Sequence, residues 1–181
     1  MARVNIGVHP KYLSDQHLIA ESVEITMITG GLRKNGFEIK SPVPETFRMG
    51  TGHINFFKNK LIYLKKRLES VNREMRRRNF KPGTKLDLNE FPKKYHNDWT
   101  PDMSSSVILR TRIVERLKKP LNGKPGHEYH RYKSSKINNY NKFCNDLYHS
   151  KLYNLNEEKK WQILTAQKYL MDLVQLSDNG E

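Results

Sequence analysis

The sequence has a single cysteine, Cys144, among its 181 residues. One cysteine cannot form a disulfide within the chain, which excludes the disulfide-rich scaffolds of small secreted domains and agrees with a reducing compartment. Long apolar runs are also missing. None approaches the roughly 18 residues of a membrane-spanning helix, and the start MARVNIGVHPKYL has no apolar signal core. We therefore expect a soluble intracellular protein of one compact domain, with at most an appendage.

Acidic residues are scarce relative to basic ones. Nineteen Asp and Glu stand against 33 Lys and Arg, which gives a formal net charge of +14. A field of this sign attracts phosphates without sequence preference and accelerates the encounter with a polyanion. An anionic membrane surface is the alternative partner, and the lack of a long apolar run disfavours it. The net charge therefore favours nucleic acid as the partner of this protein.

Two long helices are predicted in the first half of the chain. The first begins at the capping residue Ser14 and ends near Leu32. A loop with two prolines and two glycines follows over residues 41–52. Over residues 54–75, apolar side chains recur at every third or fourth position, which predicts one continuous amphipathic helix. Its other faces carry cations that are either solvated or available to phosphates: Lys58, Lys60, Lys65, Lys66, Arg67, Arg73, Arg76, Arg77 and Arg78.

Two more helices are predicted in the second half, after a loop at 81–101. The first covers about 104–118. Its spacing directs Leu109, Ile113 and Leu117 inward and leaves Arg110, Arg112 and Arg116 available outward. The last helix covers about 156–176, as packing or as a partner surface. The expected fold is all-α: a compact helical domain over 1–138 and a C-terminal helical extension over 139–181.

The segment GHEYHRYKSSK at 126–136 interleaves tyrosines with basic residues. Tyr129 and Tyr132 could stack on bases while neighbouring cations hold phosphates. Ordinary packing of the two rings is the alternative, and both interpretations stay open. A metal site is disfavoured, because His127 and His130 lack a cysteine pair or the helical HExxH spacing.

The first helix carries the one cluster that could do chemistry. His17 and Glu24 are seven residues apart, so an imidazole and a carboxylate share a helix face about two turns, roughly 10 Å, apart. Glu24 also lies among apolar neighbours, and partial burial there would suit a role in proton transfer. A solvated or salt-bridged glutamate is the alternative, and the residue pattern alone does not exclude it.

Several ordered strings resemble one known family. The chain opens with ARVN, continues with LSDQHLIAE and a glutamate at Glu24, then GTGHINFFKNKLIYLKKR, and later NDWTPDMSS before an Arg-rich helix. In order and spacing these resemble the endonuclease V-like family of pyrimidine-dimer DNA glycosylases and abasic lyases, over about residues 2–138. The resemblance implies a helical bundle in which the N-terminal segment is threaded between helices and brings the α-amine beside the helical glutamate.

The resemblance implies that Ala2 and Glu24 are the catalytic residues. After removal of Met1, the Ala2 amine would attack C1′ of the target nucleotide, displace the base and form an imine. An α-amine is a suitable nucleophile because its pKa of about 7.7–8.0 leaves a neutral fraction near pH 7. Glu24 would stabilise the positive charge on the sugar and move the proton for β-elimination. No metal or organic cofactor is needed.

Double-stranded DNA is the implied partner, bound by a monomer in the cytoplasm of a bacterial or phage-infected cell. The candidate DNA-binding residues are Arg3, Gln16, His17, Arg33, Lys34, Arg112, Arg116, Tyr129 and Tyr132. The alternatives are a non-catalytic DNA-binding protein on the same scaffold and a structural or RNA-binding partner protein.

Two positions depart from the family's pattern. The family usually has arginine immediately before the catalytic glutamate and again three residues after it, whereas this chain has Val23 and Met27. Contacts of such arginines are worth about 1–3 kcal/mol each. We therefore expect abasic-site cleavage to be favoured over dimer excision, with another damaged or modified base as an open alternative.

Overall fold

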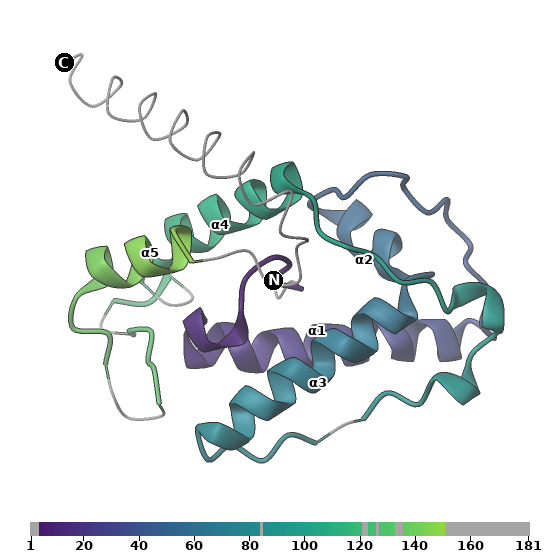
Figure 1. The fold of residues 1–181 in the computed structure, drawn as a ribbon, viewed down its shortest axis with the longest axis horizontal. Helices are drawn as coiled ribbons and strands as arrows, with labels where there is room; N and C mark the ends of the chain where they lie inside the picture. Colours follow the sequence, from purple (N-terminus) through teal and green to yellow (C-terminus); the bar gives the residue numbers. More distant parts are fainter. Residues whose placement is uncertain (1–3, 84, 121–122, 126, 133–135, 151–181) are drawn as a thin grey trace.

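The computed structural model describes residues 4–83, 85–120, 123–125, 127–132 and 136–150. Over these residues the chain is helical and contains no strand, which confirms the predicted all-α class. The helices are α1 (Asp15–Lys34), α2 (Thr51–Phe57), α3 (Leu61–Arg77), α4 (Met103–Leu117) and α5 (Tyr140–Tyr148). In Figure 1, α1 and α3 cross below, and α4 and α5 lie side by side above them. Within the described part of the chain, no helix is both long and apolar enough to span a membrane.

Helix α1 begins where the capping residues predict. The Ser14 side chain accepts a hydrogen bond from the backbone N–H of His17, and Asp15 lies in the first turn, where its charge complements the helix dipole. The helix ends at Lys34, two residues later than predicted. One face of α1 is buried, and it includes three carboxylates, Asp15, Glu21 and Glu24.

The single helix predicted over 54–75 is wrong in one respect, because the structure has two helices there. Lys60 has a non-helical backbone (φ −117°, ψ 49°) and pairs with His96 in an isolated antiparallel bridge. Its ammonium group donates to the Phe56 carbonyl at 2.9 Å, across the break. Phe57 and Leu61 are four residues apart whether or not the helix continues, so apolar spacing does not reveal this bend.

Helix α4 agrees with its prediction, while α5 was not predicted. Asp102 caps α4 by accepting from the Ser105 N–H at 2.7 Å. Helix α5 packs against α4, and its Phe143, Cys144 and Leu147 side chains join the hydrophobic core. The helix predicted over 156–176 lies outside the described residues, and the division of the chain after residue 138 stays a prediction.

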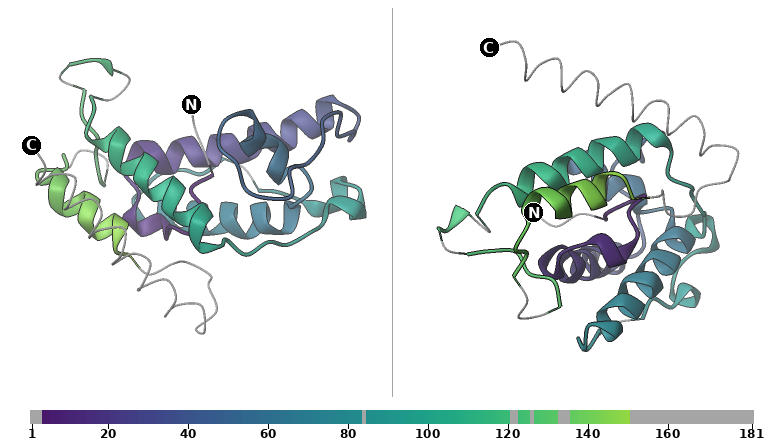
Figure 2. Two further views of the ribbon diagram at one scale, coloured as in Figure 1. Left: turned by 90° about the horizontal axis from the view of Figure 1, so that it is seen from above. Right: turned by 60° about the vertical axis from the view of Figure 1, so that its left-hand side comes forward.

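The N-terminal segment, residues 4–13, runs through the middle of the molecule. Its apolar side chains, Val4, Ile6, Val8 and Leu13, are fully buried. Figure 1 and the right-hand view of Figure 2 show this purple segment between α1 below and the α4–α5 pair above. Because the segment belongs to no long helix, its buried carbonyl groups need hydrogen-bond donors from elsewhere in the protein.

Three buried arginines supply those donors. Arg67 donates to the Val8 carbonyl at 2.6 Å, and Arg110 donates to the Gly7 carbonyl at 2.8 Å. Arg78 donates to the carbonyls of Pro10, Lys11 and Leu13 at 2.9–3.3 Å. All three were expected to point outward, and that expectation is wrong. Their charge is directed inward because the threaded segment presents carbonyl oxygens there and because buried carboxylates also meet Arg67 and Arg78.

We predict that Glu21→Gln strongly destabilises the fold. Glu21 is fully buried, binds the Arg67 guanidinium through both oxygens at 2.6 and 2.9 Å, and accepts two bonds from Asn5 at 2.9 Å. Glutamine would leave the Arg67 charge without its counterion, so we expect a loss of about 3–5 kcal/mol in the free energy of unfolding. Urea unfolding measures this loss, and Glu69→Gln, at an exposed position, is the control. Equal small effects of both changes would contradict the prediction.

Candidate active site

Glu24 is a buried carboxylate at the edge of the buried face of α1. Only 4% of its surface is exposed, and it follows Glu21 by about one helical turn. Two apolar side chains beside it on the same helix point into solvent: Val23 is 49% exposed and Met27 is 62% exposed. The helix therefore presents an acid that is shielded from bulk water next to an open apolar surface.

The N-terminal segment reaches α1 at the turn that precedes Glu24. Asn5 donates its backbone N–H and its side-chain amide to the two oxygens of Glu21, both at 2.9 Å. One residue earlier, the Val4 N–H donates to Nε2 of the fully buried His53 at 3.0 Å. These bonds fix the direction in which the chain enters. Ala2 and Arg3, two of the predicted site residues, lie outside the described residues.

Gln16, His17 and Tyr129 come together at the start of α1. The Gln16 amide donates to the Glu128 carbonyl at 3.3 Å, and its oxygen accepts from the His130 N–H at 3.0 Å. The rings of His17 and Tyr129 are stacked, with centroids 5.1 Å apart and planes 4° from parallel. Three of the predicted DNA-binding residues thus fasten the segment 127–132 to the first turn of α1.

The environment of His17 keeps its imidazole neutral near pH 7. Burial, together with the nearby Arg116 cation, lowers the pKa of His17 to about 4. The Ser14 hydroxyl lies 2.7 Å from Nδ1 and accepts from the His17 backbone N–H at 3.2 Å, so its proton is available to Nδ1. A neutral His17 can donate a hydrogen bond but does not attract phosphates as a cation.

The predicted cations fall into two groups. Arg112 and Arg116 are four residues apart on α4, both are partly exposed, and Arg116 lies near His17. Arg33 and Lys34 are at the other end of α1, about 25 Å from Gln16 along the helix axis. There the Arg33 guanidinium binds the Glu90 carboxylate at 2.7 Å and lies over the Phe91 ring.

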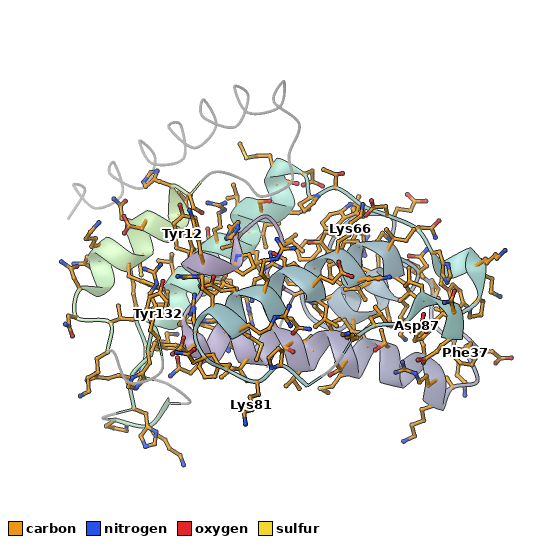
Figure 3. The ribbon with its side chains drawn as sticks, turned by 60° about the horizontal axis from the view of Figure 1, so that its bottom comes forward. Tyr12, Phe37, Lys66, Lys81, Asp87 and Tyr132 are labelled. Atoms are coloured by element: carbon orange, nitrogen blue, oxygen red, sulfur yellow. The ribbon has the colours of Figure 1, made fainter. Side chains whose placement is uncertain are left out.

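Tyr132 is surrounded by arginines. Its hydroxyl accepts a bond of 2.6 Å from Arg77, and its ring lies 5.1–5.3 Å from the guanidinium groups of Arg77, Arg78 and Arg131. The ring remains 39% exposed, whereas Tyr129 is buried. Figure 3 shows Tyr132 at the same end of the molecule as Tyr12.

The sequence argument missed the residues that hold the N-terminal segment. The sequence pattern gave no role to Glu21, and it placed Arg67 among the cations that are solvated or available to phosphates. One signal was present: Arg67 is three residues after Leu64 and four before Val71, so it lies on the apolar stripe of α3 rather than opposite it. A cation in that register is buried only if a carboxylate and further acceptors meet it there.

Comparison with protein families gives a match to the N-terminal part of the chain. Residues 1–88 match the family of pyrimidine dimer DNA glycosylases. The match confirms, over these residues, the resemblance inferred from the ordered motifs. It spans the N-terminal segment and helices α1, α2 and α3, which together carry Glu24 and its buried surroundings.

We predict that the stability contributed by neutral His17 is lost as the pH falls from about 6.5 to about 4. Above pH 6.5 the imidazole is neutral in both the folded and the unfolded chain. Between these values the unfolded chain takes up a proton that the folded chain does not, so folding becomes less favourable, by at most about 3 kcal/mol. Urea unfolding of the original protein and of His17→Asn from pH 7 to pH 4 isolates the contribution of His17 to the free energy of unfolding. The exposed His127→Asn is the control, and parallel curves for all three proteins would refute it.

Proposed function

We propose that the protein is a DNA glycosylase with abasic-site lyase activity, in which the Ala2 amine is the nucleophile and Glu24 moves the protons. The observation that carries the proposal is the burial of Glu24 on α1, one turn beyond the carboxylate that binds the N-terminal segment. The match of residues 1–88 to a family of DNA glycosylases supports the same reaction class.

Reach along the chain supports the pairing of the amine with Glu24. Ala2 is three residues before Asn5, so at most about 10 Å of extended chain separates them. Asn5 is bound to Glu21, and Glu24 is about 5 Å further along α1. An amine on so short a tether can meet the Glu24 carboxylate without any change in the helices.

The proposed reaction needs only these two groups. The neutral amine attacks C1′, the bond from C1′ to the base breaks, and the base leaves with the electron pair and takes up the proton that the amine gives up. The C1′–O4′ bond of the sugar ring then breaks, and O4′ leaves with the electron pair and takes up a proton from water. The sugar is then bound to the protein as a protonated imine. Glu24 stabilises that positive charge and takes a proton from C2′, after which the C3′–O bond breaks and the 3′ phosphate leaves. A shielded carboxylate suits both tasks, because water does not screen its charge.

The remaining exposed cations provide affinity for the substrate backbone. The +14 charge of the chain attracts duplex DNA, and the partly exposed Arg116 of α4 lies near His17 at the start of α1, with Arg112 one turn away on α4. Lysines and arginines that release counterions from DNA make such binding weaken steeply with salt. A monomer bound to double-stranded DNA inside the cell is therefore part of the proposal.

The open apolar surface next to Glu24 affects which lesion is processed. At 49% and 62% exposure, Val23 and Met27 are accessible to a bound nucleotide and offer it no charge or hydrogen bond. A base or phosphate that an arginine would hold at these positions loses that contact. We therefore propose that abasic-site cleavage is efficient and that excision of a pyrimidine dimer is weak by comparison.

We predict that Glu24→Gln uncouples imine formation from strand cleavage. Glutamine keeps the size of the side chain but cannot accept the C2′ proton, so cleavage of an abasic duplex falls about 10²-fold or more. Borohydride still traps a protein–DNA adduct, because the amine is unchanged. The exposed Glu69→Gln is the matched control and keeps both activities.

A second variant tests the amine in the same assay. Insertion of one residue after Met1 displaces the amine from Glu24, and we expect it to remove the trapped adduct while duplex binding persists. Undiminished adduct formation by this variant would refute the assignment of the amine. Equal cleavage by Glu24→Gln and Glu69→Gln would refute the assignment of Glu24.

We predict that Val23→Arg together with Met27→Arg raises dimer excision relative to abasic-site cleavage by at least about fivefold, since one recovered contact is worth about 1 kcal/mol or more. The ratio of the two activities is measured at one salt concentration. The control pair Ile19→Arg and Ile108→Arg adds the same charge at two other exposed apolar positions and leaves the ratio unchanged. A ratio already near one for the original protein would contradict the claim that Val23 and Met27 redirect the site.

A further inference from the structure

Arg110 on α4 is a cation buried among backbone carbonyls. It is fully buried, and among the described residues it pairs with no carboxylate. Burial lowers the pKa of its guanidinium to about 10, so the group is still charged at neutral pH. The cation therefore depends on the carbonyl groups around it.

Those carbonyls belong to two distant parts of the chain. Nη1 of Arg110 lies 2.6–2.9 Å from the carbonyl oxygens of Leu147, Tyr148 and Ser150, at the C-terminal end of α5. A cation is favourable there because it meets the last carbonyls and the negative end of the helix dipole. Nη2 donates in the other direction, to the Gly7 carbonyl at 2.8 Å.

Gly7 is the residue at which Arg110 contacts the N-terminal segment. Its φ of 66° lies in the left-handed region that glycine adopts readily, so the segment turns there, between the buried residues Ile6 and Val8. On one side of the turn Asn5 is bound to Glu21, and on the other Val8 is bound to Arg67. Arg110, on α4, binds the turn itself and is at the same time bound to the end of α5.

We propose that Arg110 is a positioning residue that couples α5 to the N-terminal segment and thereby sets the Ala2 amine relative to Glu24. The catalytic part of this inference rests on the proposed function. Arg110 and α5 both follow the residues that match the glycosylase family, which end at 88. The later part of the chain therefore contributes to the geometry of a site whose reacting groups lie in the first part.

The test compares Arg110→Met, Arg110→Lys and the control Phe91→Leu. Phe91 is a buried residue whose ring packs edge-on against Phe37, and Figure 3 shows Phe37 at the opposite end of the molecule from Tyr12. Hydrogen exchange of the amides of residues 4–6 reports the order of the segment without requiring activity. Borohydride trapping in single turnover reports imine formation, and duplex affinity is measured separately.

For Arg110→Met we expect faster exchange at residues 4–6 and in α5, with the exchange of α1 unchanged. We expect imine formation to slow by on the order of 10- to 100-fold while duplex affinity stays within about twofold, since a small misplacement of a reacting group has an effect of this size. Arg110→Lys gives an intermediate rate, because one ammonium cannot reach both sets of carbonyls. Phe91→Leu changes neither residues 4–6 nor the rate.

A variant on the other side of the contact keeps the test decisive if neither Arg110 variant folds. Leu147→Ala leaves Arg110 in place and loosens the buried end of α5 that supplies its acceptors. It should also raise exchange at residues 4–6 and slow imine formation, and its effect should be less than additive with Arg110→Lys if that variant folds.

The two proposals fail in different ways. If the original protein forms no borohydride adduct with an abasic duplex, the proposed function is wrong, and the exchange data alone decide whether Arg110 couples α5 to the segment. If the original protein forms the adduct and the folded Arg110 or Leu147 variants match Phe91→Leu in exchange and rate, the positioning role of Arg110 is overturned.

Discussion

The buried pair of Arg67 and Glu21 is the interaction on which the rest of the structure depends. It joins α3 to α1, and each partner also binds the threaded N-terminal segment: Glu21 accepts from Asn5, and Arg67 donates to Val8. A buried ion pair gives little net stability by itself, because removing both charges from water offsets their attraction. Its role here is to fix the path of the chain, because the pair satisfies backbone groups that would otherwise be buried without partners.

Of the three buried carboxylates of α1, Glu21 and Glu24 differ in their surroundings. Arg67 neutralises the charge of Glu21, whose role is structural. Glu24, about one turn later, lies at the boundary between the core and the open surface formed by Val23 and Met27. The same segment that Glu21 fixes leads to Ala2 within three residues. Glu21 thus anchors the segment that carries the nucleophile we propose for Glu24.

Short-range sequence signals predicted the helices whose ends are set by contacts between residues close together in the chain. Ser14 and Asp102 cap α1 and α4 because their side chains bond to backbone N–H groups three residues later. The break at Lys60 depends on a bridge to His96, 36 positions away, and the burial of Arg110 depends on carbonyls near 147 and at Gly7. Such contacts are non-local, so spacing along the chain could not reveal them. Glu24 was identified from a motif, and its burial could be seen only in the fold.

The net charge predicted a polyanionic partner, yet it did not indicate which cations face that partner. Arg67 balances Glu21, while Arg77 and Arg78 balance Glu74 and Asp15. These two clusters are neutral, so the excess of +14 resides in other residues. The field that DNA would meet therefore comes from the exposed lysines and arginines, whereas the buried arginines shape the path of the chain. Arginine performs both tasks here, and the difference is whether its nearest acceptors are carboxylates and carbonyls of this chain or phosphates of a ligand.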